Sequence, residues 1–131
     1  MPINEKYTIL MKKAVGDLEV AKLISKSDIN LTENVCFHCQ QTVEKSLKAF
    51  LAFSQIRFRY IHNLEHLVND CITVDPSFRE ISVPCSILNN YSMDIRYIDE
   101  YIISVDEMLE TVELAEEVFD FVKKKTVESN F

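Results

Sequence analysis

Apolar residues recur at steps of three and four between residues 34 and 54, the spacing of one stripe along a helix. That stripe consists of Cys36, Cys39, Val43, Leu47, Phe50 and Leu51. The opposite side is polar and carries His38, Gln41, Glu44, Lys45 and Lys48. Glu44 precedes Lys48 by four residues, which is the favourable order for an ion pair on a helix. Asn30 and Glu33 also match a capping box, which marks the start of a helix. The pattern therefore predicts a helix with one buried and one polar face.

A similar stripe predicts a first helix from Glu5 to about Lys26, capped by Asn4. Its buried positions are Tyr7, Leu10, Met11, Ala14, Leu18 and Ala21. Only a short polar turn, residues 27–30, separates this helix from the one described above. Two long helices with so short a link are expected to form an antiparallel hairpin.

The second half of the chain contains start signals for further helices. Asn63 is expected to cap a short helix, and Asp75-Pro76 to start another turn. Pro84 is expected near the start of the next helix, which ends near Met93, and Ser104 begins a capping box. The predicted inward residues are Leu64, Leu67, Val68 and Cys71, then Ile87, Leu88 and Tyr91, and finally Met108, Val112, Ala115, Phe119 and Val122. We therefore predict an all-α, up-and-down bundle of about five helices in a single domain, residues 1–131.

Composition adds limits on the class of protein. The chain is 47% hydrophobic and 27% charged, and it has a single glycine, which fits a helical globular protein. No apolar run approaches the ~20 residues that span a bilayer, and the start of the chain does not resemble a signal peptide, so we expect a cytoplasmic protein without membrane association.

The net charge of −7 argues against broad nucleic-acid binding, which depends on neutralising phosphates. The charge is uneven, because residues 1–60 carry nine basic and six acidic side chains and residues 61–131 carry five and fifteen. This asymmetry favours binding to an oppositely charged partner surface. The alternative is that the acidic side chains simply keep one helix solvated.

The residue types that commonly carry chemistry are few. Cys36 and Cys39 form a C-x-x-C on an apolar face, and a second pair of zinc ligands at the usual spacing is missing, so we expect buried thiols and no metal. His62 and His66 stand four apart without an evident third ligand, and for these two and His38 a structural or solvated role is expected. A glycine-rich phosphate loop is missing from the sequence, which predicts no cofactor.

Two polar segments could bind a ligand. If residues 55–62 are extended, Arg57 and Arg59 project from one side, and Ile56, Phe58 and Tyr60 from the other. Such a segment either grips phosphates and stacks bases or simply closes the end of the bundle. Arg96 and Tyr97 lie between two helices beside Asp94 and Asp99. An arginine so placed either presents its guanidinium to a phosphate or serves as a salt-bridged pin.

The stretch FHCQQTVEKSLKAFLAF, residues 37–53, resembles the signature helix of the HEPN domain family, in which aromatic-His-x-Gln-Gln-x-x-Glu-Lys-x-x-Lys precedes an apolar segment. Three further elements of the family follow in order. They are His-x-Leu at His62–Leu64, Tyr-x-x-x-x-Arg-Tyr at Tyr91–Tyr97, and an acidic closing helix containing Glu113-Leu-Ala-Glu-Glu-Val. The resemblance implies a helical bundle that pairs into a homodimer and is often encoded beside a minimal nucleotidyltransferase, as a toxin–antitoxin-like pair.

Many HEPN proteins are ribonucleases that carry an arginine followed, four to six residues later, by a histidine. Here Tyr101 follows Arg96 after four intervening residues, and histidine is absent beyond His66. A tyrosine with a pKa near ~10 is a poor base at neutral pH. The Arg-Tyr form resembles the branch regarded as nucleotide- or partner-binding.

The sequence and the resemblance together predict a binding module that is not an enzyme. Its expected ligand is a nucleotide, and its expected partner is a nucleotidyltransferase. The expected ligand-binding residues are Arg57, Arg59, His62, Arg96 and Tyr97. Two alternatives stay open: a metal-independent ribonuclease that uses Arg96 with a histidine from elsewhere, and a helical interaction protein without a ligand.

Overall fold

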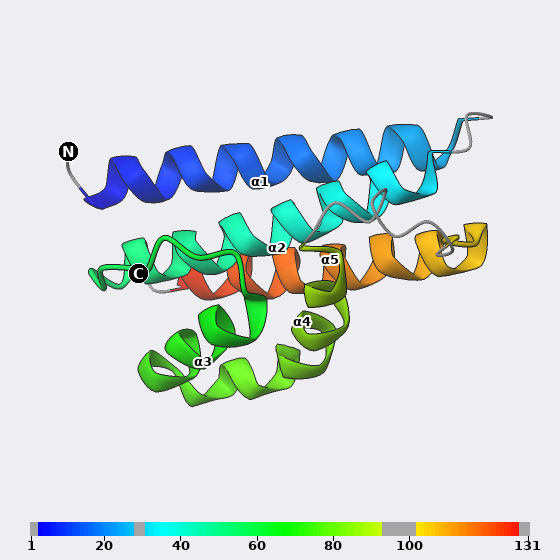
Figure 1. Cartoon of the computed structure of the whole chain (residues 1–131). Helices are drawn as coiled ribbons and strands as arrows, with labels where there is room; N and C mark the ends of the chain where they lie inside the picture. The colour runs from blue at the N-terminus through cyan, green and yellow to red at the C-terminus, as the bar shows by residue number, and fades with distance from the viewer. Residues whose placement is uncertain (1–2, 28–30, 93–101, 129–131) are drawn as a thin grey trace.

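The computed structural model describes residues 3–27, 31–92 and 102–128, and in these parts every regular element is helical (Figure 1). The elements are α1 (Ile3–Ser25), α2 (Thr32–Phe53), α3 (Leu64–Val74), the 3₁₀ turn η1 (Pro76–Ile81), α4 (Ser82–Leu88), the 3₁₀ turn η2 (Asn89–Tyr91) and α5 (Val105–Glu128). The predicted all-α bundle with five α-helices is therefore confirmed. Arg96, Tyr97 and Tyr101 lie outside the described residues.

Helix α2 is the centre of the bundle. It forms the predicted antiparallel hairpin with α1, lies along α5, and is covered on a further side by α3 and α4 (Figure 1). The predicted stripe of α2 is buried throughout, and the polar residues Gln40, Glu44 and Lys48 are buried as well. The polar side predicted for this helix is thus only partly open to water, because neighbouring elements bury Glu44 and Lys48 and leave the other members half-buried.

The core joins the apolar stripes of all the helices. Phe78 of η1 is fully buried and packs its ring against Phe50 of α2 and Phe121 of α5, with centroids 4.3 and 5.0 Å apart. Most of the residues predicted to face inward are buried. Tyr7, Leu10, Met11 and Val112 are only partly buried. Ile87 is 37% exposed, contrary to prediction, because Pro84, Cys85 and Leu88 form the buried side of α4.

Three of the predicted start signals are confirmed by hydrogen bonds. Asn63 accepts from the backbone N–H of His66 at 3.0 Å, Asp75 from that of Ser77 at 3.0 Å, and Ser104 from that of Glu107 at 3.1 Å. The expected cap of α1 was misplaced, because Asn4 lies inside that helix. The residue before α2 is Leu31, which makes no side-chain cap, and Asn30 lies outside the described residues.

The end of α2 directs the chain into the segment that follows. Gln55 has a φ of 63°, and the N–H of Ile56 donates to the carbonyl of Leu51 at 2.8 Å. This is a Schellman-type helix end, in which a left-handed residue lets the chain leave the helix axis. Residues 55–62 then run back over α2 towards α3.

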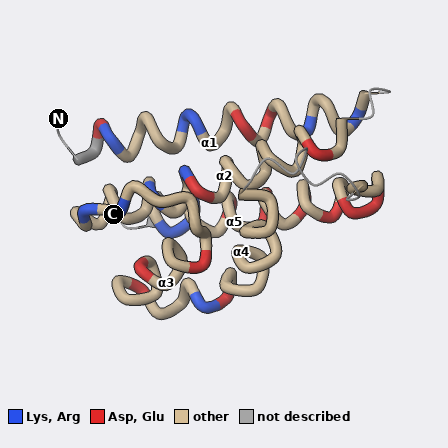
Figure 2. Tube along the Cα trace, viewed as in Figure 1, with Lys and Arg blue, Asp and Glu red and all other residues tan. Residues whose placement is uncertain are grey.

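Charge is distributed unevenly along the bundle (Figure 2). The end where α1 begins and α2 and α5 finish carries basic side chains: Lys6, Arg57, Lys123, Lys124 and Lys125. The opposite end, where α5 begins, carries Asp106, Glu107, Glu110 and Glu113. Within the described ranges, no helix is both long enough and apolar enough to cross a membrane.

Candidate functional site

A buried carboxylate on α2 organises the polar groups beneath residues 55–62. Glu44, whose side chain is 6% exposed, accepts from Lys48 Nζ at 3.0 Å and Gln40 Nε2 at 3.3 Å, and lies 2.9 Å from His62 Nδ1. Gln40 also donates to the backbone carbonyl of His62 at 3.1 Å. We call Gln40, Glu44, Lys48 and His62 the Glu44 cluster.

The Glu44 cluster follows from the repeat of α2. Gln40, Glu44 and Lys48 are spaced four residues apart, so they form a row along one side of the helix. The peptide that leads to α3 crosses this row and brings His62 onto it. The sequence signal was the Gln-Gln-x-x-Glu-Lys-x-x-Lys run itself, but the spacing alone did not show that the row is buried.

His62 presents its ring to solvent from this anchored position. Its side chain is 73% exposed, although Nδ1 lies against the buried carboxylate. Since a carboxylate only accepts, Nδ1 carries the proton, and Nε2 is left to accept or donate a proton at the surface. The arrangement suits a general acid or base and equally suits a hydrogen bond to a phosphate.

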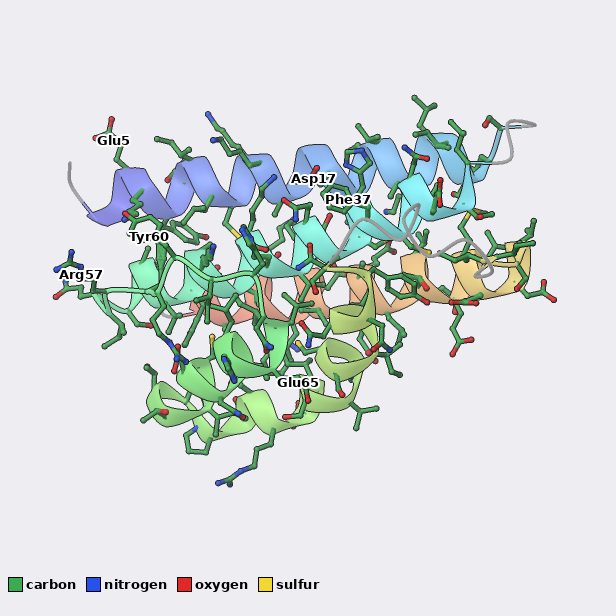
Figure 3. All side chains as sticks on the ribbon, viewed as in Figure 1. Glu5, Asp17, Phe37, Arg57, Tyr60 and Glu65 are labelled. Atoms are coloured by element: carbon green, nitrogen blue, oxygen red, sulfur yellow. The ribbon has the colours of Figure 1, made fainter. Side chains whose placement is uncertain are left out.

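The alternation predicted for this segment would place its aromatic residues on one side. The structure separates them. Phe58 is buried, with Lys6 Nζ 4.3 Å and Lys48 Nζ 5.7 Å from its ring centroid. Tyr60 is 84% exposed, and its ring lies 5.8 Å from that of Phe58 (Figure 3). Tyr60 is therefore an exposed ring that contacts a buried aromatic, and two lysines lie over the ring of that buried residue.

The two arginines of the segment differ in their surroundings. Arg59 donates through Nε and Nη2 to both carboxylate oxygens of Asp70, at 2.9–3.1 Å, and this pair fastens the segment to α3. Arg57 is exposed at the basic end of the bundle and makes no ion pair within the described residues (Figure 3). Arg57, Arg59 and His62 of the predicted site are thus all exposed, although Arg59 is held by Asp70. Arg96 and Tyr97 fall outside the described ranges.

A second, half-buried carboxylate joins α1 to α2. Asp17 receives Lys45 Nζ at 2.5 Å and lies 2.9 Å from His38 Nδ1. Its side chain is 14% exposed. His38 is therefore a link within the hairpin. His66 is exposed, and its backbone N–H donates to Asn63 while its carbonyl accepts from Arg59.

The remaining reactive side chains are held in unreactive forms. All four cysteines are buried thiols, and burial raises the pKa of each, that of Cys36 to about 11. Burial, together with a hydrogen bond to Glu107, also raises the pKa of Tyr91. Among the described residues, no group of three or more His, Cys, Asp or Glu side chains is arranged to hold a metal ion.

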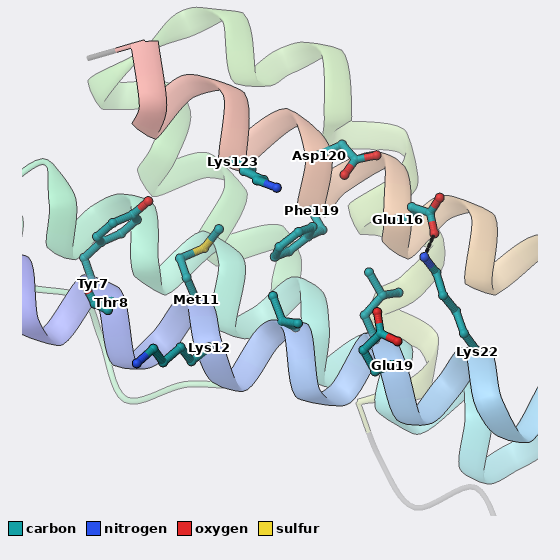
Figure 4. A pocket seen from close by; sticks show the side chains of 12 residues that line it. Tyr7, Thr8, Met11, Lys12, Glu19, Lys22, Glu116, Phe119, Asp120 and Lys123 are labelled. Atoms are coloured by element: carbon teal, nitrogen blue, oxygen red, sulfur yellow. Dashed lines mark ion pairs between the residues drawn. The ribbon is translucent and has the colours of Figure 1, made fainter. Parts of the chain in front are cut away.

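A groove of about 570 Å³ runs between α1 and α5 (Figure 4). Met11, Val15, Leu18 and Phe119 supply its apolar lining. Lys22 and Glu116 form an ion pair across the groove, which raises the pKa of Lys22. Sequence reasoning did not foresee the groove, because it depends on how far α1 and α5 diverge.

The long hairpin, the short transverse helices and the buried polar row of α2 define a class of helical-bundle domain. A family model for the HEPN domain matches residues 7–125, and the chain belongs to the HEPN family. The crystal structure of ST0689, an archaeal HEPN homologue, superposes with a TM-score of 0.71 at 26% identity and covers 92% of this chain and 97% of its own.

A relative from Methanocaldococcus jannaschii, named Putative toxin MJ1304, is 44% identical over 57 residues, which are 43% of this chain. The matched part spans 36% of that relative's length.

Proposed function

We propose that the chain is the HEPN module of a toxin–antitoxin-like pair, and that it binds a nucleotide, either free or carried by a nucleotidyltransferase partner. Membership in the HEPN family supports the module, and the relative named as a toxin supports the two-component setting. Binding is preferred to cleavage because the arginine–histidine motif of the nucleases is missing.

The observation that carries the binding proposal is the exposed ring of Tyr60 in a segment that also exposes Arg57 and His62. Stacking of a base on an aromatic ring contributes about 1–3 kcal/mol, and the exposed guanidinium of Arg57 can form paired hydrogen bonds with a phosphate. The basic end of an otherwise acidic molecule also concentrates anions there. Arg96 and Tyr97 are proposed to complete the site.

Calorimetric titration with ATP and AMP tests this proposal. Tyr60→Ala and Arg57→Ala are each expected to weaken binding about tenfold, which corresponds to the ~1.4 kcal/mol of one stacking or phosphate contact. Arg96→Ala should do the same while the helical circular dichroism stays unchanged. The matched control is Arg79→Ala, since Arg79 is an exposed arginine on η1. Affinities that are equal in all four variants would contradict the site.

A metal-independent ribonuclease is the second candidate, and the contact of His62 with Glu44 is the observation that favours it. In that reaction Nε2 would take the proton of a ribose 2′-hydroxyl, and the oxygen would attack the adjacent phosphorus as the 5′-oxygen leaves and is protonated by a second group or by water. Glu44 would hold the tautomer and stabilise the imidazolium.

Incubation with unstructured RNA separates the two candidates. We expect no cleavage by purified protein. Cleavage that disappears in both His62→Ala and Arg96→Ala, and that falls in Glu44→Gln with a shifted pH profile, would establish the ribonuclease and overturn the non-catalytic proposal.

The partner proposal has a separate test. Co-expression with a minimal nucleotidyltransferase encoded beside this gene should give a complex that survives gel filtration. A partner that elutes alone, at concentrations where both proteins are folded, would remove the nucleotidyltransferase from the proposal.

A further inference from the structure

The groove between α1 and α5 is bounded at each end by a contact between the two helices. At one end the hydroxyl of Tyr7 donates to Oγ1 of Thr126 at 2.9 Å, and at the other end Lys22 pairs with Glu116. We call these the hydroxyl end and the ion-pair end. Lys22 follows Tyr7 by 15 residues, so the groove is about 22 Å long. Its volume of about 570 Å³ lies within the ~300–1,000 Å³ that small-molecule sites occupy.

The floor of the groove is apolar. Leu18 and Phe119 are buried there, and Met11 is half-buried. Val15, which also lines the groove, is 41% exposed. A hydrocarbon chain laid against these side chains would remove apolar surface from water on both sides, which is favourable. The floor therefore suits the apolar part of a ligand.

The charged side chains are sorted along the groove (Figure 4). Lys12 and Lys123 line the hydroxyl end, and Glu19 and Asp120 line the ion-pair end. The pKa of Lys22 is raised by its ion-pair partner first and then by the charges of Glu19 and Asp120, so these carboxylates already face a cation. Within the described residues, neither Lys12 nor Lys123 forms an ion pair. The charge of the groove that still needs a partner is therefore positive.

We propose that the groove binds a small amphiphile with one carboxylate head and an unbranched apolar chain. The head lies between the ammonium groups of Lys12 and Lys123, and the chain follows the floor towards the ion-pair end. Glu19 and Asp120 fix this orientation, because they repel a carboxylate bound at their own end. Glu19 follows Lys12 by seven residues, so the chain covers about 10 Å. The site is separate from Tyr60 and does not depend on a nucleotide bound there.

The choice of head group follows from the donors in the groove. The residues that line it include lysines, but neither an arginine nor the first turn of a helix, the donors that hold a phosphate most effectively. Two ammonium groups match the two oxygens of one carboxylate.

Calorimetric titration with decanoate, below the concentration at which it forms micelles, tests the head-group site. Lys12→Gln/Lys123→Gln should weaken binding at least about tenfold, because both charge-assisted contacts are lost. The matched control is Lys13→Gln/Lys124→Gln, which removes two exposed lysines that neighbour the first pair in sequence and do not line the groove. This control should bind decanoate as the wild type does.

A tryptophan at Val15 tests the apolar floor. The indole of Val15→Trp would occupy the path of the chain and should weaken decanoate binding at least about tenfold. Val20→Trp is the matched control, since Val20 is 38% exposed on the same helix and does not line the groove. Circular dichroism should report unchanged helix in both variants.

Related ligands test the order of the charges along the groove. Decylamine should bind at least about tenfold more weakly than decanoate, because its ammonium group meets two lysines. Decanedioate should also bind more weakly, because its second carboxylate meets Glu19 and Asp120. Glu19→Gln/Asp120→Asn should restore the affinity for decanedioate.

The proposal would be overturned if decanoate at about 1 mM did not bind, or if the groove variants and their controls bound it equally. Decyl phosphate that binds more tightly than decanoate would contradict the carboxylate head. A Val15→Trp variant that changes the sedimenting mass and keeps the affinity for decanoate would assign the groove to a protein partner instead.

Discussion

The Glu44 cluster allows a quantitative test of how α2 tolerates buried charge. Lys48→Met removes the ammonium group and keeps most of the side-chain volume. Breaking a fully buried ion pair by removing one partner costs about 3–5 kcal/mol, because the other charge stays buried. Here Glu44 keeps His62 and Gln40, and the exposed ring of His62 lets water approach. We therefore expect a loss of about 2–3 kcal/mol in the free energy of unfolding.

The double variant Glu44→Leu/Lys48→Met separates the effect of an unpaired charge from that of lost packing. Replacing both partners by apolar side chains of similar size is often nearly neutral, so the double variant should regain at least about 1 kcal/mol over Lys48→Met. The control is Lys124→Met, because Lys124 is exposed and an exposed substitution changes stability by less than about 0.5 kcal/mol.

Urea unfolding followed by circular dichroism at 222 nm measures these differences. A loss of 2–3 kcal/mol should lower the midpoint by about 1–2 M at the m-values usual for a small protein. A shift in Lys48→Met no larger than that in Lys124→Met would refute the reasoning. The reasoning would also be refuted if the double variant lost as much stability as Lys48→Met and Glu44→Leu, measured separately, lose together.

The remaining predictions concern local features. Gln55→Gly should stabilise the protein by about 0.5–1 kcal/mol, because glycine adopts the left-handed φ of 63° without strain, and a lower melting temperature would count against it. Asp75→Ala should cost about 1 kcal/mol at neutral pH, as a lost N-cap. In the wild type, hydrogen bonds from Ser77 and then the contact with Lys125 lower the pKa of Asp75. The carboxylate therefore stabilises the fold above its unfolded pKa of ~3.9, and this stabilisation is lost as the pH falls through the lower folded pKa. The gap between wild type and variant should therefore narrow only below about pH 4, and a gap that is constant down to pH 2 would disagree. The four thiols should resist Ellman's reagent at pH 8, since a pKa of about 11 for Cys36 leaves roughly one thiolate in a thousand, and should react fully in denaturant.

The helices and several of their starts were predictable because their causes are local. Asn63, Asp75 and Ser104 each bond a backbone N–H only two or three residues further on, so a short stretch of sequence contains both partners. The apolar stripes repeat at helical spacing whatever the rest of the chain does. The HEPN resemblance was carried by the same stretch, residues 37–53, together with three later elements in order.

The candidate site was predictable only in part. His62 and Arg57 were singled out from sequence, and both face solvent in the structure. The buried partner of His62 was not identified, because Glu44 lies 18 residues earlier and looked like a surface residue of an amphipathic helix. Arg59 likewise meets Asp70 on the next helix, a contact that depends on the path of residues 55–62.

The sequence by itself determined where the helices form and which residues one helix offers to a core, since a helix repeats its faces at a fixed angle. Only the tertiary structure decided how many neighbours each helix has. Helix α2 is covered by α1, α3, α4 and α5, so its polar row had to be paired internally at Glu44. Helix α1 has neighbours on one side only, so Ile9, Gly16 and Leu23 stay at the surface. Periodicity defines the faces of a helix, and packing over long sequence separations decides which of those faces meet water.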